Sequence, residues 1–259
     1  MHDISTTENA VTLNNVSYAY QPGEWIVRGC NACFGKRRVA AVLGPNGRGK
    51  TTLLKLLIGA MKPSEGNITS QGEIAFVPQL FDTAFNYTAV EMVMMGRAKR
   101  LRLFSQPSRH DLDLALAMMD RFGIAHLANH PFDTLSGGQR QLVIFARALV
   151  AEADIIILDE PTSALDLQNQ VVVLRWMRRL AETEGLTVIF TTHHPHHALW
   201  VADDALLMMG HTEHEMGSVE TTLTEPNLTR LYGTAMKRIA FEHDGRKVET
   251  LTPVFEPAS

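Results

Sequence analysis

The chain has 259 residues, enough for one large α/β domain or for a core domain with an insertion. Its 45% hydrophobic residues and formal net charge of −4 are ordinary for a soluble globular protein. The balance of 24 basic against 28 acidic residues excludes a general electrostatic footprint for nucleic acid. No apolar run reaches the roughly 18 residues of a membrane span, and residues 1–9 lack a signal peptide's apolar segment. We therefore expect a cytosolic location, with attachment to a membrane partner left open.

The first third of the chain predicts strands alternating with a helix. Residues 11–20 alternate between apolar and polar side chains, as in a half-buried strand, and a Gln-Pro-Gly turn follows. Residues 39–43 are all apolar, which predicts a buried strand. A helical pattern covers 50–61, a Pro-Ser-Glu-Gly segment breaks it, and residues 74–77 predict another short strand.

The middle of the chain shows helical patterns alone, at 88–97, 108–122 and 137–151. Strand and helix patterns then alternate again, with apolar runs at 155–158, 187–192 and 205–209, a short helix at 225–232 and a polar end. We therefore predict an α/β core formed by residues 1–80 and 153–259. An all-helical subdomain, residues 81–152, is expected to interrupt it.

A glycine-rich turn separates the strand 39–43 from the helix 50–61. It fits G-x-x-x-x-G-K-[ST], in which glycines let backbone N–H groups surround a phosphate and the lysine adds a positive charge. Thr51 would offer its hydroxyl to Mg²⁺, and the helix start turns its positive end toward the same anion. We therefore predict that nucleotide phosphate is bound by Gly44, Pro45, Asn46, Gly47, Arg48, Gly49, Lys50, Thr51 and Thr52.

Two acids end the apolar run 155–158. Four bulky apolar residues in a row are typical of a parallel strand buried on both faces, and open α/β sheets bind ligands at the carboxyl ends of such strands. We expect Asp159 to hold the magnesium shell and Glu160 to polarise the attacking water.

A third motif opens the helix 137–151. Ser136 is placed to cap this helix, and Gln139, three residues on, would complete a capping box. The glycines between them expose N–H groups at a helix start, which predicts a second phosphate site in the same chain. The motif consists of Leu135, Ser136, Gly137, Gly138 and Gln139.

The order and spacing of these three motifs resemble those of ABC ATPases, the nucleotide-binding subunits of ATP-binding-cassette transporters. The resemblance covers roughly residues 11–232. It implies a P-loop NTPase (RecA-like) fold with a parallel-sheet core, an N-terminal antiparallel β part and the helical insertion. It also implies a head-to-tail homodimer that holds ATP and Mg²⁺ between one subunit's phosphate loop and the other's signature motif, residues 135–139. Two phosphate sites on separate subdomains are most simply used across a twofold axis.

Further positions take their roles from this resemblance. Tyr20 lies where the family stacks an aromatic residue on adenine, with Tyr18 as the alternative. Gln79 matches a glutamine that contacts magnesium and water. Asp166 lies in a loop that crosses to the partner subunit, and His193 matches the histidine that contacts the γ-phosphate. Gln79 and His193 would thus join the second acid in catalysis.

Several segments resemble one branch of the family. Residues 76–79, 88–93 and 95–97 are similar to ATPases of importers for iron chelates, haem and cobalamin. Residues 164–170 and 190–195 are similar to those of molybdate importers. The resemblance implies an integral membrane permease dimer, a periplasmic or surface substrate-binding protein as an indirect partner, and a peripheral location on the cytoplasmic face of the inner membrane. No nucleic acid is expected as a partner.

Two other classes compete with this interpretation. A non-transport ABC ATPase acting as a clamp on nucleic acid or an assembly scaffold would carry a long heptad region, a second cassette or a basic excess, and the sequence has none of these. An exporter would often carry a fused membrane domain. The cargo itself is not predicted, because an ATPase subunit does not touch it.

Some features depart from the family or invite other interpretations. Arg48 replaces a small residue and is expected to extend toward solvent or the partner, and His194 replaces a frequent acid. The histidine cluster at 193–197 has no fixed ligand geometry, and the resemblance places only one of its histidines in catalysis, so a metal site is not expected there. The Cys-x-x-Cys at 30–33 is interpreted as small buried packing residues rather than a metal or redox site. The basic run 97–102 predicts a solvated face, with anionic lipid or a permease loop as the alternative. We expect core or permease-groove roles for Met92, Met94, Met95, Met118 and Met119.

Overall fold

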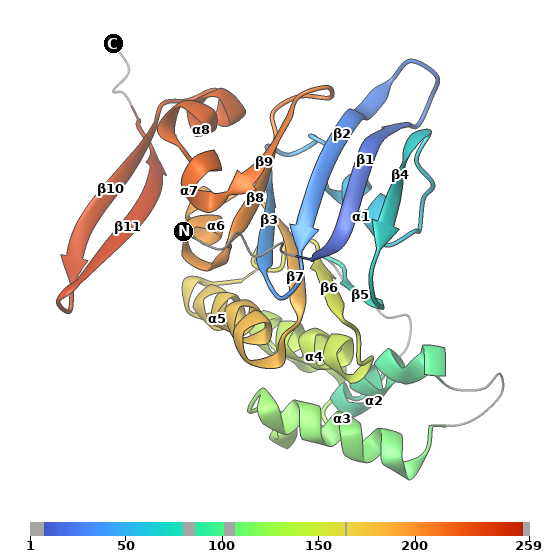
Figure 1. Ribbon diagram of the computed structural model, residues 1–259. Coiled ribbons are helices and arrows are strands. Elements are labelled where there is room, and N and C mark those ends of the chain that lie inside the picture. The colour runs from blue at the N-terminus through green and yellow to red at the C-terminus, as the bar shows by residue number, and fades with distance from the viewer. Residues whose placement is uncertain (1–7, 80–85, 101–106, 164, 256–259) are drawn as a thin grey trace, which may run out of the picture.

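The computed structural model describes residues 8–79, 86–100, 107–163 and 165–255. Its central sheet has six strands, ordered β5-β6-β7-β3-β8-β9, and only β9 runs antiparallel to its neighbour (Figure 1). The predicted parallel core is therefore confirmed. The strands are β3 (Val39–Leu43), β5 (Ile74–Val77), β6 (Ile155–Leu158), β7 (Thr187–Thr192), β8 (Asp204–Met208) and β9 (His214–Ser218).

A second, antiparallel sheet lies on one side of the core. Its order is β2-β1-β4, with β1 at Asn9–Ala19, β2 at Trp25–Gly35 and β4 at Glu65–Ser70. Helix α1 (Lys50–Leu57) is shorter than predicted, and its leucines share one buried cluster with apolar side chains of β1, β2 and β6. Each leucine buried in this way contributes about 1.5–3 kcal/mol. The cluster fixes the start of α1 against both sheets.

Helices cover the other face of the central sheet and form a layer beside it (Figure 1). Between residues 86 and 152 the described chain contains helices and one isolated bridge, Thr88 to Pro131, as expected from its helical patterns. The bounds 81–152 for a subdomain remain a prediction. The helices are α2 (Ala89–Met94), η1 (Met95–Arg100), α3 (Arg109–Arg121), η2 (Ala125–Leu127), η3 (Phe132–Thr134), α4 (Gly137–Val150), α5 (Leu167–Glu184) and α6 (Pro195–Val201).

The basic run begins with a buried residue. Arg97 is 9% exposed; its Nε donates to Asp111 Oδ1 at 2.8 Å and its Nη1 to Glu152 Oε1 at 2.7 Å. The prediction of a solvated face is therefore wrong for Arg97, because these two carboxylates bring its charge inside. Hydrogen bonds from Ser108, and then Arg97, lower the pKa of Asp111 to about 2. Residues 101 and 102, and the side chains of 99 and 100, lie outside the described part of the chain.

The methionines of this region pack as predicted. Met92 and Met119 are fully buried in the larger hydrophobic cluster. Met94, Met95 and Met118 are partly buried against the same cluster. Unbranched thioether side chains suit the irregular spaces between short helices.

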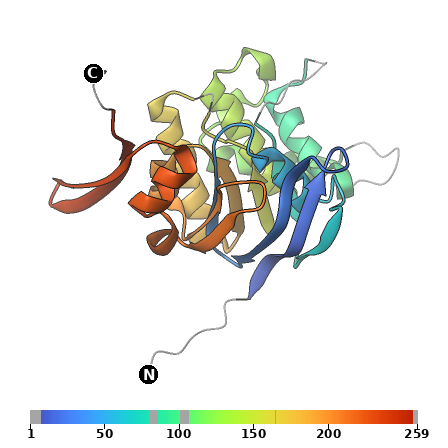
Figure 2. The same ribbon diagram turned by 90° about the horizontal axis from the view of Figure 1, so that it is seen from above.

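The chain ends in elements that the sequence interpretation missed. After α7 (Val219–Thr222) and α8 (Glu225–Tyr232), strands β10 (Met236–His243) and β11 (Arg246–Pro253) form a separate two-stranded ribbon. The ribbon projects from the body in both views (Figures 1 and 2), and its base packs on α6 through β11 and on α8 through β10. The sequence interpretation expected a polar end there but not a hairpin. The turn Asp244-Gly245, with φ angles of 50° and 70°, was the available hairpin signal.

Candidate active site

The loop between β3 and α1 requires glycine at two positions. Gly47 and Gly49 have φ angles of 77° and 92°, in the left-handed region. A Cβ on Gly49 would also lie 2.5 Å from Ile26 Cγ2, so a larger residue would force the loop away from β2. The backbone thus turns tightly into α1, whose first N–H groups have no acceptor within the helix.

Lys50 closes this loop on itself. Its side chain is 6% exposed, and its Nζ donates to the backbone oxygens of Gly44 at 2.9 Å and Pro45 at 3.2 Å. The same nitrogen lies 3.2 Å from Glu160 Oε1. A phosphate entering the loop would therefore meet a cation that is already positioned.

The predicted catalytic residues follow neighbouring strands of the central sheet. Val77 pairs with Leu158, Leu158 with Phe190, and Leu43 with Thr192. Because these strands are parallel, the residues after them gather at one edge of the sheet. This register brings together Gly44 after β3, Gln79 after β5, Asp159 and Glu160 after β6, and His193 after β7.

Glu160 is the centre of this edge. Its Oε2 lies 3.2 Å from His193 Nδ1 and accepts Gln79 Nε2 at the long distance of 3.5 Å. Its other oxygen faces Lys50, as described above. Glu160 has a φ of 44°, a left-handed conformation that costs a non-glycine residue about 1–2 kcal/mol. Its N–H donates to Thr191 Oγ1 at 2.8 Å, which holds the strained backbone in place.

Asp159 is more buried than Glu160. It is 3% exposed, and its Oδ1 accepts the hydroxyl of Thr191 at 2.7 Å. Its N–H donates to Val77 O at 2.9 Å, continuing the pairing of β6 with β5. The carboxylate is therefore oriented by two neighbouring strands. Thr51, in the first turn of α1, is exposed, whereas Thr52 is buried.

The signature segment caps its own helix. Ser136 Oγ accepts the N–H of Gln139 at 3.4 Å, and Gln139 Oε1 accepts the N–H of Ser136 at 3.0 Å. The predicted capping box is confirmed. Leu135 is buried in the helical core, while Ser136 and Gly137 are exposed at the start of α4.

Gly138 joins the signature segment to α5. A Cβ at Gly138 would lie 2.3 Å from Asn169 Oδ1, so only glycine fits this contact. Asn169 in turn donates its N–H to Asp166 Oδ1 at 2.8 Å, which makes Asp166 the N-cap of α5. The predicted cross-subunit loop therefore leads into the helix against which α4 begins. Ala164 in this loop lies outside the described residues.

Comparison with known proteins identifies the family. The model of the family described as ABC transporter matches residues 27–163. The chain belongs to this family. It is thus an ABC ATPase, which binds and hydrolyses ATP, and the fold predicted from its motifs is confirmed.

Three known proteins illustrate what this ABC ATPase is similar to. It is 39% identical to the molybdate import ATP-binding protein MolC of Haemophilus influenzae, over 96% of each chain. A solved metal-chelate type ABC transporter in an inward-facing conformation matches with a TM-score of 0.92 and 37% identity, over 96% of this chain and 99% of that one. A dimeric ATP-binding cassette in a post-hydrolysis state, bound to ADP and Pi, matches with a TM-score of 0.72 and 26% identity, over 81% and 98%.

The two candidate adenine-stacking residues differ in exposure. Tyr20 is 57% exposed, and its hydroxyl lies 3.2 Å from Thr52 Oγ1, beside the phosphate loop. Tyr18 packs against the hydrophobic cluster beneath and meets the ring of Tyr20 edge-on, with centroids 5.2 Å apart. Tyr20 therefore has the freer face, and Tyr18 supports it.

The histidine cluster is a packed stack of rings. Neighbouring ring centroids lie 4.0 Å apart for His193 and His194 and 4.4 Å apart for His196 and His197. Burial, with some repulsion from the neighbouring rings, lowers the pKa of His194 to about 4 and that of His197 to about 3. No group of three or more His, Cys, Asp or Glu residues in the described chain is placed to hold a metal ion.

The structure bears on two further expectations. Arg48 is only partly exposed, and its Nε is buried without a hydrogen-bond partner, so the alternative that its side chain points to the partner subunit stays a prediction. Cys30 is buried, which raises the pKa of its thiol to about 12, but Cys33 is exposed. The strand β2 turns alternate side chains outward, so the interpretation of both cysteines as buried packing residues is wrong for Cys33.

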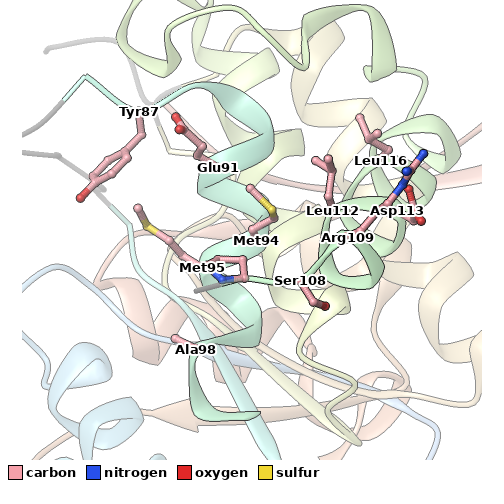
Figure 3. Close-up of a pocket in the computed structure, with 11 residues that line it drawn as sticks. Tyr87, Glu91, Met94, Met95, Ala98, Ser108, Arg109, Leu112, Asp113 and Leu116 are labelled. Atoms are coloured by element: carbon pink, nitrogen blue, oxygen red, sulfur yellow. The ribbon is translucent and has the colours of Figure 1, made fainter. Parts of the chain in front are cut away.

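A groove of about 870 Å³ lies in the helical layer, between α2, η1 and the start of α3 (Figure 3). Apolar side chains line most of it, and Glu91, Arg109 and Asp113 add charge. Among the described residues, no helix combines the length and hydrophobicity that a bilayer crossing requires. The apolar lining residues include Tyr87, Met94, Met95, Ala98, Leu112 and Leu116.

Proposed function

We propose that two copies of this ABC ATPase bind ATP and Mg²⁺ between them, and that hydrolysis drives import of a metal chelate or a molybdate-type oxyanion through a separate permease. One observation carries the catalytic part of this proposal: Lys50 at the start of α1, His193 after β7 and Gln79 after β5 all approach the Glu160 carboxylate. The import part is supported by the transport functions of the relatives.

Glu160 is the proposed general base. Its carboxylate, which faces the ammonium group of Lys50 in this structure, would accept a proton from the attacking water. When the γ-phosphate enters the loop, Lys50 exchanges the carboxylate for phosphate oxygens, and Glu160 is released to meet the water. His193 then contacts the γ-phosphate and Gln79 orients the water, while backbone N–H groups of the loop and of the first turn of α1 surround the β-phosphate.

The donor set fits magnesium. The Thr51 hydroxyl, the Asp159 carboxylate and the Gln79 amide oxygen are hard oxygen ligands of the kind that Mg²⁺ prefers. Gln79 engages Glu160 and Ser163 through its amide nitrogen, which leaves the amide oxygen for another partner. Asp159 is already oriented by its bond from Thr191. When bound, the ion would neutralise charge on the phosphates.

The second phosphate contact is proposed to act in trans. Ser136 and Gly137 are exposed at the start of α4, where free N–H groups suit a phosphate. A related cassette is a dimer with ADP and Pi bound. Ser136, Gly137, Gly138 and Gln139, with Leu135 anchoring them, would therefore face the partner's nucleotide, and Asp166 would cross the same seam. Tyr20 would stack on adenine with its exposed face.

The groove of Figure 3 is the proposed seat of the permease. It is apolar, it lies in the helical layer that carries the signature segment, and Met94 and Met95 give it adaptable walls. Docking there would place this ABC ATPase at the cytoplasmic face of the inner membrane, as a peripheral subunit of a permease dimer. A periplasmic or surface substrate-binding protein would then be an indirect partner, which contacts the permease and not this chain.

Reconstitution tests this function. The chain is assembled in liposomes with the permease encoded beside it and the corresponding binding protein, and uptake of molybdate and of an iron chelate is measured with ATP inside or outside. Uptake of one cargo that requires ATP on the cassette side supports the proposal. A permease-free chain that copurifies with nucleic acid, together with no ATP-dependent uptake of either cargo, would contradict it. The Glu160→Gln complex serves as the matched inactive control.

A further inference from the structure

Helix α6 begins without a side-chain cap. It spans only Pro195–Val201, and its N-cap residue, His194, makes no side-chain capping bond. Since His193 immediately precedes this cap, whatever fixes the start of α6 also fixes the proposed γ-phosphate contact. The backbone at this start is held locally: the N–H of His194 donates to Thr192 Oγ1 at 3.0 Å, and the N–H of His197 donates to His194 O at 3.1 Å. Neither bond reaches the segment that carries Glu160.

His197 provides a different anchor, from within the helix. Its ring is 4% exposed, and its Nδ1 lies 3.2 Å from the hydroxyl of Thr162, which is itself 3% exposed. Thr162 follows Glu160 by two residues, and His197 follows His193 by four, across the start of α6 at Pro195. The two segments therefore contact each other at two places: Glu160 meets His193 at the sheet edge, and Thr162 meets His197 in the interior.

The Thr162 side of this contact is also fixed. Gln170 Nε2 donates to Thr162 O at 3.3 Å and to Leu165 O at 3.0 Å. Ser163 Oγ donates to Glu160 O at 3.0 Å. The segment from Glu160 to Leu165 is therefore held to itself and to α5, and it offers His197 a rigid attachment point.

The contact between Glu160 and His193 must change when nucleotide enters, because both side chains then take new partners. The interior contact need not change. We propose that His197 is a positioning residue for hydrolysis: its bond to Thr162 keeps His193 at a fixed distance from the segment that carries Glu160. This inference rests on the proposed catalytic roles of Glu160 and His193.

The chemistry of the His197 ring suits a permanent contact. Burial lowers its pKa to about 3, so the ring stays neutral over the pH range in which hydrolysis is measured. A neutral ring nitrogen can either donate to or accept from the threonine hydroxyl. Positional errors of about 1 Å cost up to 10²-fold in rate, so even a small shift of α6 should be visible in kcat.

The test uses the full chain and two near-isosteric changes, His197→Phe and Thr162→Val. Each removes the hydrogen bond while keeping most of the buried volume. We expect each variant to bind ATP as the parent does and to lose about tenfold in kcat, the equivalent of one net hydrogen bond. The double variant should lose no more than either single one, because both remove the same contact. His197→Asn, which places an amide near the ring's Nδ1, should restore much of the rate.

Thr222→Val is the matched control. Thr222 is also buried, and its Oγ1 donates to Ser218 O at 2.8 Å, away from the site. It should lower thermal stability as Thr162→Val does and leave kcat unchanged. If His197→Phe does not fold, the comparison of Thr162→Val with Thr222→Val decides the question. Parent-like kcat in Thr162→Val, or additive losses in the double variant, would overturn the positioning role. A parent that does not hydrolyse ATP would instead contradict the proposed function.

Discussion

The two phosphate-facing segments of this chain differ in how complete they are. The phosphate loop has its cation buried, bonded to its own backbone and paired with Glu160. The signature segment satisfies itself through a capping box and leaves Ser136 and Gly137 exposed. The phosphate loop can bind a phosphate with groups of its own subunit, whereas the signature segment exposes its helix start to a second molecule. This difference is the physical reason to expect a dimer, and the following changes separate the two segments.

Glu160→Gln should have the largest effect on turnover. The amide keeps the shape of the side chain but cannot accept the proton of water, so we expect kcat to fall about 10²- to 10⁴-fold while ATP still binds. Phosphate release under single-turnover conditions measures the loss. Glu220→Gln, an exposed change on α7, is the control. A parent-like rate in Glu160→Gln would show that the base lies elsewhere.

Lys50→Ala should weaken ATP binding by the phosphate loop. One charge-assisted phosphate contact is lost, so the Kd for ATP should rise about tenfold to a hundredfold. Calorimetric titration of the full chain measures it. Lys55→Ala removes an exposed charge from the last turn of the same helix and should leave Kd unchanged. Equal effects of the two changes would mean that only net charge matters.

Ser136→Arg should damage the signature segment alone. In the Glu160→Gln background, ATP-dependent dimerisation should weaken at least about tenfold, because the bulky cation occupies the seam and the contacts to the partner's phosphate are lost. Light scattering with and without ATP measures it, and ATP binding by the monomer should persist. Ser108→Arg removes an equivalent exposed capping box from α3 and should leave the dimer intact. Loss of monomer binding would argue against a role in trans.

The smallest expected effect concerns folding of the helical layer. The pKa of Asp111 is about 2 in the folded chain, below its usual 3.8. Its stabilising contribution is therefore complete above pH 3.8 and is lost as the pH falls through about 2. Asp111→Asn should flatten the acid unfolding curve in this window, measured by circular dichroism. An unchanged curve would mean that the ion pair between Asp111 and Arg97 does not stabilise the folded chain.

The sequence predicted the edge of the sheet well, because each catalytic residue directly follows an apolar run whose carboxyl end is easily recognised. It did not predict how Lys50 and Glu160 meet, since their side-chain positions depend on packing between distant strands. The strand β4 was missed because it is mostly exposed and shows no apolar alternation. Helix α5 was expected only as part of the strand and helix alternation, without bounds, because its β-branched Val171, Val172 and Val173 weaken the helical signal. Arg97 was misjudged because its acidic partners are distant in sequence.

The terminal ribbon has a mechanical consequence. Its base packs on α6, the helix that starts beside the proposed γ-phosphate contact, and on α8, where Lys237 and Arg238 bond to Glu225. The tip projects away from the body, so a rotation of these two helices would displace the tip further than the base. A fluorophore attached near Asp244 would therefore report nucleotide turnover from outside the seam, without touching any residue that takes part in it.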